Sequence, residues 1–151
     1  MPTEADDHLI ALLTDQREAL GAAVFAQMLR EVPGYDRLDP VRLRAQNLHS
    51  VDTVIRTLAE RNPALASHYV DELTAQRLAE GVPITVFLVA VQVVETVIRA
   101  AIRAGLAADP PAAAHALHRV DRAFSLVRNV VGRRNLANVM QPPGSDPPTN
   151  R

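Results

Sequence analysis

Prolines divide this chain into segments of helical length. Three of them follow residues that cap helices well, in the pairs Asp39–Pro40, Asn62–Pro63 and Asp109–Pro110. A carboxylate or amide before a helix accepts hydrogen bonds from its first free N–H groups, and proline at the first helical position loses none. Pro83 follows Gly81–Val82, and that glycine is suited to close the preceding helix. These positions predict where helices begin and end.

The punctuation and the apolar spacing predict an all-α fold, a compact bundle of about five helices. No stretch shows a sustained alternation of apolar and polar residues, so we expect no strands. Residues 1–140 are predicted to form one helical domain, and residues 141–151 a proline-rich linker or tail. The tail resembles the start of a connection to another domain, although a free C-terminus is the alternative. The expected helices cover residues 4–31, 40–61, 63–80, 84–105 and 110–140.

The segment after Pro83 is apolar around most of its circumference, which predicts a helix buried on several sides. Such a helix is the centre of the domain, or it also gives one face to a partner subunit, and we expect both. Its Glu95 and Arg99 have the spacing of an ion pair within a helix. Taken singly, each of our candidates for a pocket or a homodimer interface is more typical of plain core. These candidates are Phe87, Val91, Val94, Glu95, Ile98 and Phe124.

Composition excludes several classes of protein. The 151 residues are 48% hydrophobic but only 3% aromatic, and they contain no cysteine, which excludes disulfides and thiolate chemistry. The net charge of -1 argues against a general polyanion binder. The acidic N-terminus is unlike a signal peptide, and the most apolar run contains Gln92 and Glu95. We therefore expect a soluble, cytoplasmic protein that does not enter a membrane.

We expect neither catalysis nor a cofactor. The serines have no evident His–Asp constellation, and the six glycines form no phosphate-binding loop. His68 with Glu72, and His115 with His118, have ligand-like helical spacing, yet none of the histidines is placed to point into an apolar cavity. We therefore predict surface histidines that hold no metal or haem. The five histidines are His8, His49, His68, His115 and His118.

Arginine supplies all 16 basic residues, and five of them fall between residues 115 and 140 against the single Asp121. We interpret this segment as a solvated or internally paired face rather than a phosphate-contacting helix. DNA would then be bound only through a domain outside this chain. Arg17 falls near the middle of an apolar stripe, where it either snorkels to the surface or pairs with a buried carboxylate.

Two segments carry a family resemblance. The first is Val32-Pro33-Gly34-Tyr35-Asp36-Arg37-Leu38 with the later Asn47-Leu48, and the second is Ala79-Glu80-Gly81-Val82-Pro83-Ile84 with Leu88 and Ala90. Together they resemble the helical N-terminal sensor domain of PucR/CdaR-like transcription regulators and RsbR-type stressosome proteins. The resemblance implies a globin-like fold that dimerises without haem and precedes a DNA-binding or STAS output domain. Val91-Gln92 departs from the aromatic residue and arginine common in the family.

The sequence therefore predicts the N-terminal regulatory domain of a PucR-like transcription regulator that acts as a homodimer. A small molecule or a partner protein would alter packing around the helix after Pro83, and the last helix would carry the change to an output domain. An RsbR-type stressosome sensor or scaffold domain is the first alternative. A stand-alone helical carrier of haem or another small ligand is the second.

Overall fold

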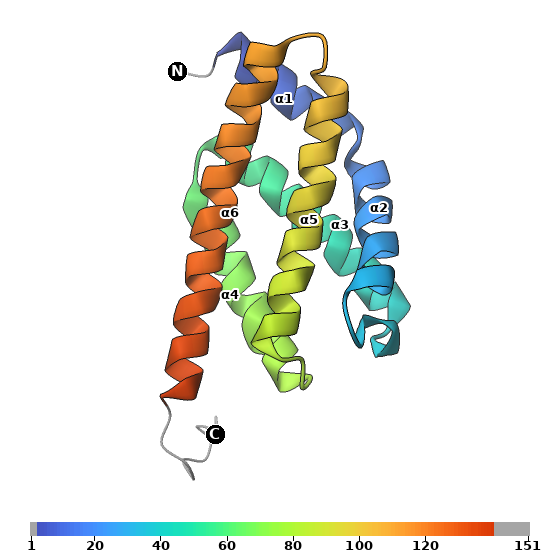
Figure 1. The fold of residues 1–151 in the computed structure, drawn as a ribbon, viewed down its shortest axis with the longest axis vertical. Helices are drawn as coiled ribbons and strands as arrows, with labels where there is room; N and C mark the ends of the chain where they lie inside the picture. The colour runs from blue at the N-terminus through green and yellow to red at the C-terminus, as the bar shows by residue number, and fades with distance from the viewer. Residues whose placement is uncertain (1–2, 141–151) are drawn as a thin grey trace.

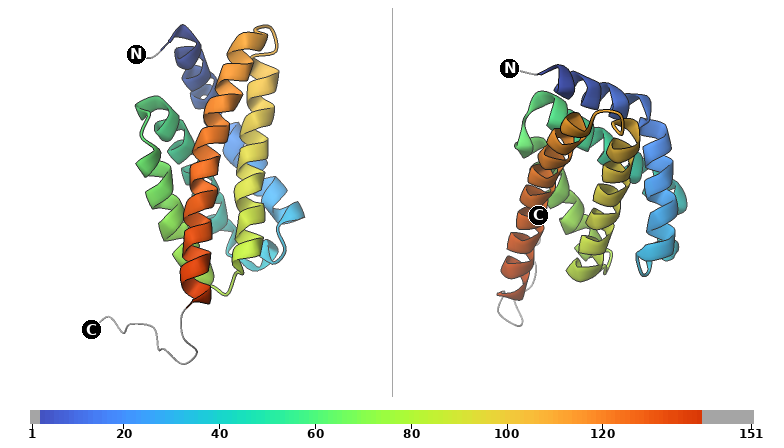
Figure 2. Two further views of the ribbon diagram at one scale, coloured as in Figure 1. Left: turned by 60° about the vertical axis from the view of Figure 1, so that its left-hand side comes forward. Right: turned by 45° about the horizontal axis from the view of Figure 1, so that its top comes forward.

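A computed structural model describes residues 3–140, and these residues form helices and connections without a strand. The all-α class is thus confirmed for the described part. The helices lie largely alongside one another, and α1 crosses one end of the bundle (Figures 1 and 2). The elements are α1 (Glu4–Asp15), α2 (Arg17–Glu31), the short 3-10 helix η1 (Tyr35–Arg37), α3 (Pro40–Glu60), α4 (Pro63–Ala79), α5 (Ile84–Gly105) and α6 (Pro110–Val139).

The predicted helix starts are confirmed. Asp39 accepts a hydrogen bond from the Val41 N–H at 3.0 Å, and the caps of α4 and α6 work in the same way through Asn62 and Asp109. Gly81 takes φ 82°, which L side chains rarely adopt, and so ends α4. These helix ends could be predicted from the sequence because each cap involves only a few consecutive residues.

The first predicted helix is two helices, so α-helices number six rather than five in the described chain. Its continuity ends at Gln16, which has φ -100° and ψ 6°. The turn lets α1 pack on α3, α5 and α6 while α2 runs alongside α3 and α5. Neither proline nor glycine marks the position, because the break is set by where α1 docks.

Arg17 begins α2 just after this break. Its Nε and Nη2 donate to both carboxylate oxygens of Asp52, at 2.7 Å each. The side chains of both residues are about one-third exposed. Of the two predictions for Arg17, pairing with a carboxylate is therefore the correct one. The carboxylate of Asp52 is only partly buried, however.

Helix α5 packs against α1, α2, α4 and α6, which confirms the predicted burial on several sides, while one strip of it that includes Thr85, Val89 and Gln92 is exposed. Within residues 3–140 it is the one helix long and apolar enough to cross a membrane. A single such helix is weak evidence for a span, since a core helix of this kind passes the same test. Its buried residues are Ile84, Phe87, Ala90, Val91, Val93, Val94, Glu95, Ile98 and Ile102.

The buried stripe of α3 is rotated relative to the simplest apolar pattern. Leu48 and Ile55 are only partly buried, whereas Asn47 is almost fully buried in line with Leu43 and Val51. Helix α3 is packed against α2 on one side and α4 on the other, so two neighbours decide which positions are covered. The rotation places a polar side chain inside the bundle.

Candidate functional site

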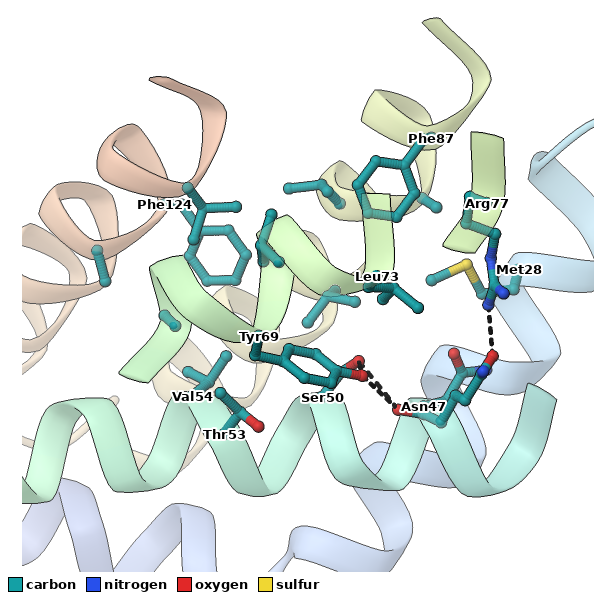
Figure 3. A pocket seen from close by; sticks show the side chains of 18 of the residues that line it. Met28, Asn47, Ser50, Thr53, Val54, Tyr69, Leu73, Arg77, Phe87 and Phe124 are labelled. Atoms are coloured by element: carbon teal, nitrogen blue, oxygen red, sulfur yellow. Dashed lines mark hydrogen bonds between the residues drawn. The ribbon is translucent and has the colours of Figure 1, made fainter. Parts of the chain in front are cut away.

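A cavity of about 60 Å³ lies between the helices of the bundle. Figure 3 shows side chains from several elements converging on it, with Tyr69, Phe87 and Phe124 around the space and Arg77 at one end. Both α5 and α6 contribute lining residues. A change in what the cavity contains therefore affects side chains of both helices. Its lining residues are Met28, Tyr35, Gln46, Asn47, Ser50, Thr53, Val54, Thr57, Ala66, Tyr69, Val70, Leu73, Arg77, Phe87, Ala90, Val91, Val94, Ala123, Phe124 and Val127.

Arg77 forms the polar end of the cavity and is only 3% exposed. All three of its guanidinium nitrogens already donate hydrogen bonds, with Nε reaching the Tyr35 hydroxyl at 3.3 Å and Nη1 reaching Glu80 at 3.2 Å. The third nitrogen, Nη2, donates to Gln46. Glu80 supplies the opposite charge that a buried cation requires. Glu80 also pairs with the exposed Arg42 at 3.4 Å, so the two arginines share this carboxylate.

Every hydroxyl on the cavity wall also has a partner. Ser50 Oγ lies 2.8 Å from the Tyr69 hydroxyl and donates to a backbone carbonyl of its own helix. Thr53 and Thr57 donate to carbonyls one turn earlier, at 2.8 and 2.7 Å. The Tyr35 hydroxyl accepts from the guanidinium described above. None of these groups requires a ligand for its hydrogen bonding.

Burial raises the pKa of both tyrosines above the ordinary value of 10.0. For Tyr35 the hydrogen bond and positive charge of Arg77 oppose that rise, and for Tyr69 the hydrogen bond with Ser50 does so. Both phenols are consequently neutral at pH 7. The cavity contains hydroxyl groups but no tyrosinate.

Asn47 is the exception on the cavity wall. Its side chain is 97% buried, because the residue exposes only 3% of its surface. Among the buried side-chain nitrogens and oxygens of the described residues, its Nδ2 is the single one without a hydrogen-bond partner. A buried donor left unpaired costs about 1–3 kcal/mol. This amide therefore marks the place where the cavity lacks an acceptor.

Four of the six candidate residues line the cavity, namely Phe87, Val91, Val94 and Phe124. The other two lie elsewhere: Ile98 is buried in the core, and Glu95 pairs with Arg128 of α6. A role for any of the six in a dimer interface stays a prediction.

The expected ion pair of Glu95 with Arg99 is wrong. Arg128 binds Glu95, and Arg99 instead donates to Asp121 on α6. The two helices pack side by side, so partners on α6 compete with the partner one turn away. These contacts join α5 to α6.

Sequence reasoning missed most of the polar residues of the cavity. Asn47 and Tyr35 lay within the segments that carry the family resemblance, but nothing local marked them as buried. One available signal was the spacing of Leu43, Asn47 and Val51, which places a polar residue in register with two buried apolar ones. Arg77 had a similar signal, since it lies seven residues after the buried Val70 on α4.

All five histidines are exposed, as predicted, and none lines the cavity. Within residues 3–140, no group of three or more His, Asp or Glu side chains is arranged to hold a metal ion. Of the five arginines in the basic segment, three pair with acids of other helices: Arg119 with Asp6, Arg128 with Glu95 and Arg134 with Asp71. Much of that positive charge is consequently compensated within the fold.

The family model described as the RsbT co-antagonist protein rsbRD N-terminal domain matches residues 18–133, well over half of the chain. The chain belongs to this family. The match favours the RsbR-type alternative, so the PucR-like transcription regulator is not supported as the main interpretation. No curated protein and no solved structure matches the chain. The likeness to a globin therefore stays a prediction.

Proposed function

We propose that this chain is the signal-sensing domain of an RsbR-type regulator. The family description, co-antagonist of RsbT, supports an output that acts on an RsbT-like partner. In this proposal a signal changes packing around the cavity, and α6 carries the change to an output domain of the full-length protein. The protein would do this without catalysis of its own.

The observation that carries the proposal is the path from the cavity to the end of α6. Ala123, Phe124 and Val127 line the cavity, and the same helix continues to Val139. A helix transmits a shift or rotation along its length, because its backbone hydrogen bonds hold consecutive turns together. A packing change at Phe124 therefore reaches the last turns of α6.

A cavity-filling substitution tests this path. Ala90→Leu adds volume from α5 into the cavity, and Ala90→Val adds less, while Ala100→Leu makes the larger change on the exposed side of the same helix. We expect both Ala90 variants to alter hydrogen exchange at residues 130–139, by an amount that follows the added volume. Ala100→Leu should leave that exchange unchanged. Equal exchange in all variants would contradict transmission through α6.

We also propose that the chain forms a homodimer through the outer face of α5 and α6. No other helix of the described chain covers this face in Figure 1. Two apolar side chains on these helices are exposed: Val89 of α5 is 38% exposed and Leu126 of α6 is 42% exposed. Sedimentation equilibrium should give twice the chain mass of 16.4 kDa, and Val89→Glu should shift the equilibrium toward the monomer. A monomer at high protein concentration would refute this part.

A further inference from the structure

The size of the cavity limits what it can hold. A protein cavity of about 150 Å³ lined by apolar side chains holds benzene. At about 60 Å³, the cavity of this bundle has less than half that space. Without movement of the helices, its occupant is therefore a molecule of about two to four non-hydrogen atoms.

The unpaired amide fixes the polarity of the occupant at one point. Asn47 Nδ2 is an N–H donor that lacks an acceptor, whereas every hydroxyl on the wall has a partner within the protein. The rest of the wall is mainly hydrocarbon and aromatic, with Phe87 and Phe124 among its largest members. The occupant therefore carries one acceptor atom beside a small apolar part.

The lining of the cavity disfavours a charged occupant. Arg77 is the cation on the cavity wall, and all three of its guanidinium nitrogens already donate hydrogen bonds within the protein, one of them to Glu80 at 3.2 Å. An anion would enter a largely apolar space in which each nitrogen of the one cationic side chain already has an acceptor, and a cation would meet no carboxylate on the wall. Burying an unpaired ion is far more costly than burying a neutral group. The occupant is therefore neutral.

We infer that the cavity is a binding site for a small neutral hydrogen-bond acceptor, such as a short-chain alcohol, aldehyde or amide, held by the side-chain amide of Asn47. This inference rests on the proposed sensing function and names the chemical class of its signal. The acceptor oxygen lies against Nδ2, and the alkyl part lies against Phe87 and Phe124. A three-atom ligand binds with a Kd on the order of 1 mM at best, because each non-hydrogen atom contributes a limited free energy.

Four probes, each of three non-hydrogen atoms, distinguish an effect of ligand size from an effect of its acceptor atom or charge. Ethanol has an acceptor oxygen, propane has none, ethylammonium is a cation and formate is an anion. Each is titrated into the full chain while NMR follows the side-chain NH₂ resonances of Asn47 and, for variants without that amide, the methyl resonances of Val91 and Val94 on the cavity wall. Ethanol should shift these resonances saturably, propane should bind more weakly, and the two ions should give no saturable shift.

Asn47→Leu is the decisive variant. It keeps a side chain of similar size and removes the unpaired donor, so the protein should fold at least as stably as the wild type. The variant should lose at least tenfold in ethanol affinity and gain affinity for propane, which reverses the wild-type preference. Asn135→Leu, an exposed asparagine on α6, is the matched control and should leave both affinities unchanged.

Three outcomes would overturn the inference. One is the same order of probe affinities in the wild type and in Asn47→Leu, and another is saturable formate binding at the Asn47 amide. The third is a resident water bound to Nδ2 that ethanol does not displace, because an ordered water would then satisfy the amide. Ethanol binding that leaves the resonances of residues 130–139 unchanged would support this ligand class while contradicting the proposed transmission.

Discussion

The carboxylate of Asp6 attaches α1 to the rest of the bundle, and its removal should undo that attachment. The residue is 4% exposed. The backbone N–H and hydroxyl of Thr3 each donate to it at 3.0 Å, which caps α1. Arg119 donates at 2.8 Å, His115 lies 3.2 Å away, and Arg61 donates as well. One side chain thus joins α1 to α6 and to the end of α3.

Asp6→Asn keeps the shape of the side chain and removes its charge. The Asn oxygen still accepts from the Thr3 N–H, so the largest loss is the charge-assisted bond to Arg119, which is 14% exposed and contributes about 1.5–3 kcal/mol. The half-exposed partners Arg61 and His115 add about 1 kcal/mol or less each. Arg119 keeps its bond to the Leu58 carbonyl, which limits the loss. We expect the free energy of unfolding to fall by about 3–4 kcal/mol.

Asp7→Asn is the matched control, since Asp7 is exposed in the same first turn and loses the same charge near the same helix start. We expect it to change stability by about 0.5 kcal/mol or less. Urea unfolding followed by far-UV circular dichroism at pH 7 measures both variants. Equal stability of the two variants would refute the assignment of Asp6 as the residue that anchors α1.

The pH dependence tests the same residue independently. The Thr3 backbone N–H, against the opposing effect of burial, holds the pKa of Asp6 well below its ordinary 3.8, with help from the Thr3 hydroxyl, His115 and Arg119. Because the unfolded chain binds the proton more readily, this stabilisation is full above the unfolded-state pKa and is lost as pH falls through the folded-state pKa. Wild-type stability should therefore fall more steeply below pH 3.8 than that of Asp6→Asn. Equal slopes would contradict the shift.

Further substitutions and a titration test other parts of the fold. Arg128→Met should lower the free energy of unfolding by about 2 kcal/mol, because it leaves the buried carboxylate of Glu95 without its partner, whereas Arg122→Met on the same helix should change it by about 0.5 kcal/mol or less. Tyr35 and Tyr69 should ionise above pH 10.0 in an absorbance titration of the folded protein. Since their pKa values are raised on folding, stability should be full below that pH and fall as pH rises through the folded-state values. Ionisation of both at pH 10.0 in the folded protein would show that they are not buried as described.

The helix boundaries were predictable because their causes are local. Asp39 and Asn62 cap the helices that directly follow them. Gly81 adopts the positive φ at the end of α4. The break at Gln16 was not predictable in this way, because it depends on the surface that α1 meets after the chain has turned. Sequence therefore predicted the helices better than their docking.

The candidate site was also predictable only where its features have local causes. The apolar character of α5 predicted its burial, and so Phe87 and Val91 were placed near the centre correctly as core residues. The buried state of Asn47 and Arg77 depends on partners or neighbours 30 or more residues away, such as Gln46 for Arg77. A void is less predictable still, because it is the space left after every side chain has packed.

The unpaired amide connects stability and sensing through one residue. No group of the described protein accepts a hydrogen bond from Asn47 Nδ2, so an occupant that offers an acceptor adds a hydrogen bond that the bundle alone does not make. A ligand shifts an equilibrium only by its difference in affinity between two packings. One that contacts Asn47 on α3 and Phe124 on α6 together distinguishes packings in which those helices lie at different separations. The unpaired donor is thus placed where binding can bias the position of α6.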